Sequence, residues 1–418
     1  MFSLHRFGIK LELGTIQHML NGLGDPHRSY SCIHIAGTNG KGSVAAMLSR
    51  IFQAAGLRVG LYTSPHLVRF NERICIDNQP ILDQEVVNAY ERVKALAPPQ
   101  RQPTFFEFTT AMALYEFARQ KVQWAIVETG MGGRMDATNI IRPAISVITN
   151  ISLEHKTYLG RTLSAITNEK AGIIKSDIPV VTGVRQQAAW NVIKKTASLV
   201  NAPLYRLGTD FSVRRRKDQS FTFKGQQTTW RQVALNLSGD HQFGNAGLAL
   251  ATCELLQIRK LASIDEASIR TGLARVSWPG RLEVALTSPL LILDGAHNLM
   301  AARLLARYLN QYINGRRLTL VIGILDDKPY KQILRDLAPC CERIIITQPV
   351  IDRAVQADLL AREARDSGRN VEIIVDVGHA VQHALNTSSK EDAICVAGSL
   401  YVVGEAKKAL AGLGLAHK

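Results

Sequence analysis

The residues best suited to chemistry form a glycine-rich stretch, GTNGKGS, at residues 37–43. An apolar run typical of a strand precedes it, and a helical run follows. Glycines let a backbone pass close to phosphate oxygens, and the first turn of a helix offers N–H groups and the positive end of its dipole. Lysine adds a point charge, and serine can ligate Mg²⁺ or bond a phosphate. The stretch therefore predicts a phosphate site made by Gly40, Lys41, Gly42 and Ser43.

This stretch is not a literal Walker A motif. That motif has Gly six residues before its Lys and Ser or Thr directly after it. Here Ile35 stands six residues before Lys41, and Gly42 separates Lys41 from Ser43. The alternative interpretation is a glycine turn ahead of a helix cap. The preceding strand, the following helix and the Lys-Gly-Ser ending favour phosphate binding.

Four further polar clusters each follow a predicted strand. They span residues 62–73, 128–139, 152–174 and 293–298. In open α/β sheets ligands bind at the carboxyl ends of strands, so the clusters are expected to converge near the phosphate loop. Glu128 ends an apolar run ahead of a glycine-rich loop, which suits a Mg²⁺ ligand. Taken singly, the other three clusters are better or equally well explained by a surface loop, a structural histidine or solvated lysine, or a common Asp-Gly turn, whereas the motif context of Glu128 favours function over a helix cap or a loop salt bridge.

The elements that must position these residues alternate between strand and helix. We expect strands at about 33–36, 58–63, 73–76, 124–128, 144–149 and 179–183, and helices at about 44–55, 83–97, 105–120, 162–171 and 187–198. An amphipathic helix is expected within the first 30 residues. Residues 211–213, 220–223 and 233–237 alternate in polarity, as antiparallel strands do, and helices follow at about 241–257 and 264–274.

A second α/β series follows Pro279-Gly280, with strands expected at 290–293, 318–322, 343–347, 371–375 and 393–397. The prediction is an α/β protein with an N-terminal P-loop-type, mostly parallel sheet that carries a small antiparallel section, and a C-terminal Rossmann-like domain. A length of 418 residues also favours two domains. We place them at 1–280 and 281–418.

The composition narrows the classes of molecule that the protein is expected to bind. The net charge of +15 is compatible with nucleic acid, an anionic membrane or small acidic molecules. The basic residues are dispersed, apart from a run at 214–217, and no nucleic-acid module is recognisable, which favours small acidic ligands. The six cysteines show no paired spacing, and no run approaches the roughly 18 apolar residues that a membrane helix needs. Together these observations predict a cytoplasmic protein.

Six motifs in one order resemble a known family. They are GTNGKGS at 37–43, TSPHL with RFNER at 63–73, Glu128 with GMGG at 130–133, EKAGI at 169–173, PGR at 279–281 and DGAHN at 294–298. Together they are similar to folylpolyglutamate synthase and, more broadly, to the Mur-ligase superfamily of ATP-dependent amide-bond ligases. The resemblance spans roughly residues 20 to 400, and the ordered set is far more specific than any one motif.

The resemblance implies a reaction. A substrate carboxylate attacks the γ-phosphate of ATP to give an acyl phosphate, the amine of L-glutamate attacks the acyl carbon, and phosphate leaves. Catalysis is then chiefly positioning and charge neutralisation. The family implies an ATP-binding central domain at 1–280 and a glutamate-ligase domain at 281–418, with the active site between them.

The resemblance also implies residue roles. Gly40, Lys41, Gly42 and Ser43 hold phosphates. Ser64 and Glu128 ligate one Mg²⁺ and His155 a second. Lys170 matches a lysine that is carbamylated in the family and, with His297, is assigned to catalysis. The implied ATP contacts are Asn245, Arg281 and Asp294, and Arg73 is a weaker candidate for a glutamate or product carboxylate.

A second activity, dihydrofolate synthesis from dihydropteroate and glutamate, is implied by RMDATN at 134–139, which is similar to the motif of bacterial bifunctional enzymes. There the Asp contacts the pterin, which implies a substrate site at Asp136 and Ala137, with Phe106 stacking on the ring. The competing interpretation of Phe106 is a core aromatic. Two departures from the family, Leu299 in place of Pro and Thr129 after Glu128, remove no functional group.

Several alternatives remain open. One is a folylpolyglutamate synthase that lacks the second activity. A peptidoglycan Mur ligase would carry a UDP-binding domain before the phosphate loop, where this chain has only 36 residues. A P-loop kinase would need no second α/β domain, and a non-enzymatic nucleotide-binding module would not explain Glu128, His155 and Lys170. The expected partners are ATP, Mg²⁺, L-glutamate and folate substrates, with no nucleic acid or membrane, and the expected state is a monomer.

Overall fold

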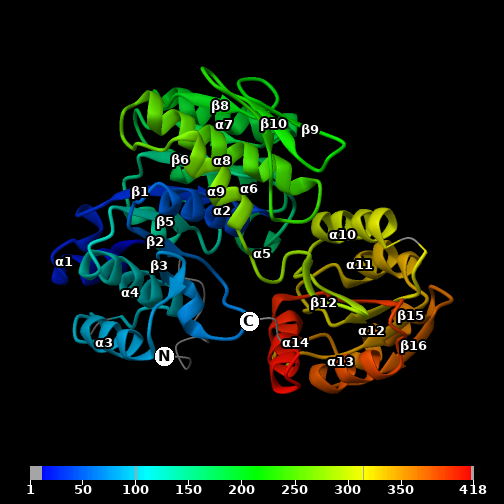
Figure 1. Ribbon diagram of the computed structural model, residues 1–418. Coiled ribbons are helices and arrows are strands. Elements are labelled where there is room, and N and C mark those ends of the chain that lie inside the picture. Colours follow the sequence, from blue (N-terminus) through cyan, green and yellow to red (C-terminus); the bar gives the residue numbers. More distant parts are fainter. Residues whose placement is uncertain (1–11, 99–100, 314, 416–418) are drawn as a thin grey trace. The chain divides into compact units, whose positions relative to one another are not determined.

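The computed structural model describes residues 12–98, 101–313 and 315–415, and these divide into two compact units. Among the described residues, the first unit comprises 12–65, 70–98, 101–236 and 240–277, and the second comprises 66–69, 237–239, 278–313 and 315–415. In Figure 1 the first unit runs from blue to yellow-green and the second from yellow to red. The helix expected within the first 30 residues is α1, Gly14–Gly22, and residues 1–11 lie outside the described part of the chain.

The first unit is built on an eight-stranded sheet with the order β4-β3-β2-β5-β1-β6-β7-β8. From β2 to β8 in that order neighbouring strands are parallel, whereas β3 and β4 add an antiparallel edge. Its strands are β1 Ser31–Ala36, β2 Val59–Tyr62, β3 Ile74–Ile76, β4 Gln79–Pro80, β5 Trp124–Glu128, β6 Ile145–Ile148, β7 Val180–Thr182 and β8 Leu204–Arg206. Because β5 lies between β1 and β2, the strand order reverses beside β1, which is where ligands bind in such sheets.

Buried apolar runs explain these strands. β5 and β6 are buried along their whole length, as expected of parallel strands covered on both faces. The helices of this unit are α1 Gly14–Gly22, α2 Lys41–Ala54, α3 Asp83–Lys94, α4 Phe105–Arg119, α5 Lys156–Leu159, α6 Leu163–Lys170, α7 Gln187–Leu199, α8 His241–Ile258 and α9 Glu266–Arg275. The 3-10 helices lie at Pro26–Arg28, Phe70–Arg73, Ala137–Ile140 and Ala171–Ile173.

A small antiparallel sheet, β11-β10-β9, completes the first unit. Its strands are β9 Ser212–Arg215, β10 Phe221–Lys224 and β11 Thr229–Val233. The prediction of a strand at 233–237 was wrong, because the pairing with β10 begins at Thr229 and ends at Val233. The apolar residues beyond Val233 lead instead towards the segment 237–239, which belongs to the second unit.

The second unit carries a six-stranded sheet with the order β12-β13-β17-β14-β15-β16. Every neighbouring pair is parallel except β12 with β13, and this antiparallel edge strand was missed because Glu283–Thr287 is only partly buried. The strands are β12 Glu283–Thr287, β13 Leu290–Leu293, β14 Leu318–Ile322, β15 Arg343–Ile346, β16 Asn370–Ile373 and β17 Ala393–Ala397. The helices are α10 Leu299–Tyr312, α11 Tyr330–Leu337, α12 Ala357–Arg365, α13 Val377–Asn386 and α14 Leu400–Gly412, with a 3-10 helix at Ala338–Cys340.

The α/β prediction for both halves is thus confirmed. Helix α10 also shows that Leu299 begins a helix without proline, because the Asn298 side chain accepts from the Ala301 N–H at 2.9 Å. No helix in the described ranges is both long and apolar enough to cross a membrane.

Helix α2, which carries the phosphate loop at its start, packs directly on α9. A Cβ placed on Gly272 of α9 would lie 2.5 Å from the Ile51 Cα and 2.6 Å from its N. Backbone atoms cannot move aside as a flexible side chain can. The glycine therefore sets the distance between the two helices.

We predict that Gly272→Ala destabilises the first unit by about 1–3 kcal/mol, the usual cost of forcing atoms into a packed core, despite the higher helix propensity of alanine. Calorimetric unfolding measures the change. Gly14→Ala is the control, since Gly14 is also helical and a Cβ there would meet nothing within 4 Å. Equal stability of the two variants would contradict this account of the α2–α9 contact.

Candidate functional site

The phosphate loop follows β1 and ends where α2 begins at Lys41. Gly40 has φ 83°, a left-handed conformation that favours glycine, and a Cβ there would lie 2.5 Å from the Asn245 Oδ1. The first turn of α2 consists of Lys41, Gly42 and Ser43, whose N–H groups have no partners within a helix. The structure therefore gathers the four predicted loop residues at a helix N-terminus and places Asn245 beside them.

The loop is held by the end of the neighbouring strand β6. Asn150 accepts from the Asn39 N–H at 3.0 Å through its Oδ1 and donates to the Asn39 carbonyl at 2.8 Å through its Nδ2. The Thr149 hydroxyl donates to the same carbonyl at 2.7 Å, and the Thr38 N–H donates to the Asn150 carbonyl at 2.8 Å. Sequence reasoning missed both residues, although their position at the carboxyl end of a predicted parallel strand was a usable signal.

A second set of contacts ties the loop to α8. The Gln242 amide donates to the Ser43 Oγ at 3.3 Å, and the Asn245 amide donates to the Gln242 Oε1 at 2.8 Å. All three side chains are buried. The sequence predicted no role for Gln242, and the structure shows that it links Asn245 to the loop serine.

Lys41 and Ser64 both lie close to Glu128. The Lys41 Nζ is 3.7 Å from the Glu128 Oε1, and the Ser64 N–H donates to the Glu128 Oε2 at 3.4 Å. Glu128 is 5% exposed. The carboxylate thus sits at the end of β5, between the phosphate-loop lysine and the residue that follows β2.

The oxygen atoms of Glu128 and Ser64 are of the kind that ligates Mg²⁺. The ion prefers hard oxygen ligands and is usually held by one or two carboxylates together with substrate phosphates. Glu128 and the Ser64 hydroxyl are such oxygens. In the described part of the chain no three His, Cys, Asp or Glu side chains form a group that could hold a metal ion.

Lys170 lies at the C-terminal end of α6 with its amine at the phosphate loop. Its Nζ donates to the Gly37 carbonyl at 2.7 Å, and the side chain is 4% exposed. Burial, and then the positive charge of Lys41, lowers the pKa of Lys170 to about 7, although Glu154 and Asp136 oppose the shift. A substantial fraction of this amine is therefore neutral near pH 7.

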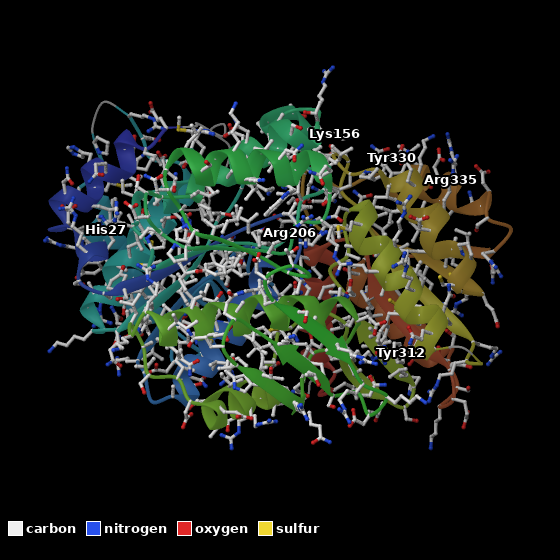
Figure 2. All side chains as sticks on the ribbon, turned by 90° about the horizontal axis from the view of Figure 1, so that it is seen from above. His27, Lys156, Arg206, Tyr312, Tyr330 and Arg335 are labelled. Atoms are coloured by element: carbon white, nitrogen blue, oxygen red, sulfur yellow. The ribbon has the colours of Figure 1, made fainter. Side chains whose placement is uncertain are left out.

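His155 precedes α5 and has φ 51°. Its Nε2 lies 3.9 Å from the Glu154 Oε1, and about a third of the side chain is exposed. Ser152, three residues earlier, donates its N–H to the Thr38 Oγ1 at 3.0 Å, so this segment leaves β6 next to the phosphate loop. The next side chain, Lys156, is exposed and extends away from the ribbon (Figure 2).

Phe106 and Asp136 meet at the glycine loop after β5. A Cβ on Gly130 would lie 2.5 Å from the Phe106 Cζ, so only glycine leaves space for that ring. The ring centroid of Phe106 is 5.9 Å from that of Tyr62. Asp136 is buried and accepts from the Met131 N–H at 2.8 Å, and Ala137 follows it as the first residue of a 3-10 helix.

Arg73 packs against Phe105, the residue before Phe106. Its side chain is buried, and its Cζ is 5.1 Å from the centroid of the Phe105 ring. The Arg73 carbonyl accepts from the Thr63 N–H at 3.1 Å, which fixes the backbone between β2 and β3. An arginine over an aromatic face contributes a cation–π contact, so packing accounts for part of its position.

In the second unit, three predicted residues gather: Arg281 lies just before β12, and Asp294 and His297 lie just after β13. Asp294 is buried and accepts from the Leu282 N–H at 2.8 Å and the Ala296 N–H at 2.9 Å. Burial raises the pKa of Asp294, and the neighbouring Arg281 is the strongest opposing influence. A Cβ on Gly295 would lie 2.4 Å from the Arg281 Nη1, and the His297 Nδ1 lies 2.7 Å from the Gly295 carbonyl.

Comparison with known proteins agrees with this arrangement. Residues 35–253 match the Mur ligase middle domain, and residues 280–400 match the Mur ligase glutamate ligase domain. The chain is 35% identical to a dihydrofolate synthase/folylpolyglutamate synthase of Bacillus subtilis, over 97% of this chain and 96% of that protein. It is 31% identical to the Escherichia coli protein of the same name, over 96% of this chain and 92% of that protein.

Solved structures agree as well. The folylpolyglutamate synthase of Thermotoga maritima superposes with a TM-score of 0.86 at 38% identity, over 96% of this chain and 94% of that one. E. coli FolC in complex with DHPP and ADP superposes with a TM-score of 0.91 at 29% identity, over 98% of this chain and 96% of that one. From these matches and the site geometry, the chain belongs to the Mur ligase superfamily, within its family of dihydrofolate synthases and folylpolyglutamate synthases.

Proposed function

We propose that this chain is an ATP-dependent ligase that adds L-glutamate to dihydropteroate, which yields dihydrofolate, and to reduced folates, which yields folylpolyglutamates. The observation that carries the proposal is the gathering of Lys41, Glu128 and Lys170 around one glycine loop. The relatives with matching domains carry the names of these two activities, and solved relatives contain ADP or DHPP.

The first step transfers a phosphoryl group. A substrate carboxylate oxygen attacks the γ-phosphorus of ATP, the bond to the β-phosphate oxygen breaks, and an acyl phosphate and ADP result. Gly40, Gly42 and the amides of the first α2 turn hold the phosphates, Lys41 neutralises developing charge, and Ser43 bonds a phosphate or the metal. We also assign to Asn245 a contact with the nucleotide, which its position against Gly40 supports.

Ser64 and Glu128 are the proposed ligands of one Mg²⁺, and His155 is the proposed ligand of a second. When bound, Mg²⁺ supplies positive charge that neutralises phosphate oxygens during transfer. A solved relative from Yersinia pestis contains AMPPNP and a Mn ion. The residues of this chain contribute the carboxylate, the hydroxyl and the imidazole.

The second step forms the amide. The L-glutamate amine attacks the acyl carbon, a C–N bond forms, and inorganic phosphate leaves from the tetrahedral intermediate while the amine loses a proton. Arg281, Asp294 and His297 are proposed to act on ATP and the reacting groups from the domain at 281–418, and the domain at 1–280 to supply the phosphate loop. Arg73 remains a weaker candidate for binding a glutamate or product carboxylate.

We propose that Lys170 is carbamylated. The Lys170 ammonium first loses a proton, the neutral amine then attacks CO₂ and a C–N bond forms, and a second proton is released, so a cation becomes an anion. A pKa of about 7 supports this, because carbamylation requires the neutral amine. The carbamate would place a negative charge beside Lys41, as part of a metal site or as a contact that fixes the phosphate loop.

The pterin of dihydropteroate is proposed to lie against Phe106, Asp136 and Ala137. The proximity of Phe106 to Gly130, within the loop that Asp136 closes, supports this. The remaining proposals are a monomeric state, a cytoplasmic location and no nucleic-acid partner. The free, mostly buried cysteines are consistent with a reducing compartment.

Purified protein with ATP, Mg²⁺ and L-glutamate tests the function. We expect glutamate-dependent phosphate release with dihydropteroate and, in a separate reaction, with tetrahydrofolate, each with the glutamylated product detected by mass spectrometry. Release with tetrahydrofolate alone would reduce the proposal to a monofunctional folylpolyglutamate synthase. Absence of release with both substrates would refute it.

Lys170→Ala should lower activity by roughly a hundredfold or more, since it removes a buried charged group at the phosphate site. Removing dissolved CO₂ should lower wild-type activity, and restoring the same concentration of dissolved CO₂ should recover it faster at pH 8 than at pH 6, because the neutral amine predominates above its pKa. With ¹³CO₂, NMR should show a carbamate carbon that the variant lacks. The control is Lys194→Ala, on the exposed face of α7. Full activity of Lys170→Ala would exclude the carbamate.

Asn150→Ala should weaken ATP binding, because the variant loses both side-chain bonds that hold Asn39. Two part-buried hydrogen bonds correspond to about 1–3 kcal/mol, or a rise of roughly fivefold to 150-fold in the dissociation constant of a non-hydrolysable ATP analogue. Isothermal titration calorimetry measures it. Asn191→Ala is the control, since Asn191 bonds only to Gln187 on the exposed α7 surface among the contacts described for it. An unchanged dissociation constant would show that the loop does not depend on Asn150.

A further inference from the structure

A buried histidine on the central strand reaches the proposed pterin site through one hydroxyl. His34 lies on β1, is completely buried, and has its Nε2 2.8 Å from the Thr138 Oγ1. The Thr138 Oγ1 in turn lies 2.5 Å from the Asp136 Oδ1. Three side chains from β1 and from the loop after β5 therefore form one chain of hydrogen bonds.

The direction of these bonds follows from the carboxylate. An ionised Asp136 can only accept, so the Thr138 hydroxyl donates its proton to it. The hydroxyl oxygen must then accept from His34, which assigns the hydrogen of the ring to Nε2. The Nδ1 is buried without a hydrogen-bond partner, as a bare ring nitrogen can be at lower cost than an unpaired N–H. Burial, followed by the charge of Lys175, lowers the pKa of His34 to about 3, so the ring is neutral at physiological pH.

Asp136 depends on this hydroxyl. Burial raises the pKa of the Asp136 carboxyl, and the Thr138 hydroxyl is the strongest influence in the opposite direction. The Oδ1 accepts from both the hydroxyl and the N–H of Thr138, and the Oδ2 accepts from the Met131 N–H at 2.8 Å. Loss of the hydroxyl bond therefore favours the protonated carboxyl and leaves Asp136 held by backbone N–H groups alone.

We propose that His34 is a positioning residue for the pterin of dihydropteroate: it orients the Thr138 hydroxyl so that Asp136 stays ionised and fixed towards the substrate. The inference rests on the proposed function, since it assumes that Asp136 contacts the pterin. An aminopyrimidinone edge presents N–H donors, which an ionised carboxylate accepts and a protonated one accepts poorly. His34 itself touches no substrate.

The hydrogen-bonded series His34–Thr138–Asp136 is called the relay below. Two removal variants and two conservative variants test it. Thr138→Val keeps the shape and removes the hydroxyl, and His34→Leu removes the donor to it. Each should raise the KM for dihydropteroate roughly tenfold or more, the effect of one hydrogen bond to a charged group, while the KM for ATP changes less than about twofold. Thr138→Ser and His34→Gln, which keep a hydroxyl and an N–H donor, should restore most of the loss.

The double variant gives the sharper readout. If His34 acts through Thr138, the His34→Leu/Thr138→Val protein should be no worse than Thr138→Val alone, whereas independent effects would multiply. Ser146→Ala is the matched control: Ser146 pairs with His34 across β1 and β6, and its hydroxyl donates a buried bond to the Ile173 carbonyl at 2.9 Å. This control should leave the KM for dihydropteroate unchanged.

The outcomes separate the relay from the function. A wild-type protein that uses tetrahydrofolate but not dihydropteroate would overturn the second activity and the relay with it. A wild-type protein that uses both, together with an unchanged KM for dihydropteroate in Thr138→Val, would overturn the relay alone. An equal rise in Ser146→Ala, or in the KM for ATP, would also overturn it, since the effect would then be general loosening of the core. Thr138→Val keeps the test decisive if His34→Leu fails to fold.

Discussion

The central place of β1 in its sheet is the constraint on which the site depends. Strands β5 and β6 flank β1 in parallel, so three chain segments end at the same edge. The backbone bonds continue past the strands: the Thr129 N–H donates to the Ile35 carbonyl at 2.9 Å, and the Thr149 N–H donates to the Ala36 carbonyl at 2.9 Å. The phosphate loop, the Glu128 loop and the Asn150 segment are therefore fixed relative to one another before any ligand arrives.

The same constraint creates an electrostatic problem at that edge. Lys170 and Glu128 are buried and Lys41 is half-buried, and isolated buried charges are costly. Glu128 offsets one lysine at 3.7 Å, and the Gly37 carbonyl accepts from the other at 2.7 Å. The remaining free-energy cost of burying the Lys170 cation lowers the pKa of its amine. The neutral amine is the form that carbamylation requires. Strongly perturbed groups of this kind gather at functional sites.

Contacts that fix side chains before a ligand binds continue from the phosphate loop along the loop that follows β5. Asp136 accepts from the Met131 N–H across this loop, and Gly130 leaves space for the Phe106 ring. The Thr138 hydroxyl bonds to Asp136 and is itself bonded to His34. The loop also contacts the end of α6, since the Arg134 N–H donates to the Glu169 carbonyl at 2.8 Å, one residue before Lys170. One loop thus joins the proposed pterin site to the lysine at the phosphate site, which suits a reaction that must align a bulky acid with ATP.

The sequence by itself determined the α/β class, most elements of both sheets, and the residues of the phosphate loop, because apolar periodicity and glycine spacing are local properties. The edge strands β8 and β12 escaped it, and β11 was misplaced, since short, half-buried strands take their limits from their partners. Only the tertiary structure showed the contacts of Asn150, Gln242 and His34 at the site. Each is a common polar residue without a motif of its own, and its role comes from a contact across about a hundred or more residues of sequence, such as the one between Gln242 and Ser43. Burial, which shifts the pKa of Lys170, is likewise a property of the folded chain and cannot be read from the residues around position 170.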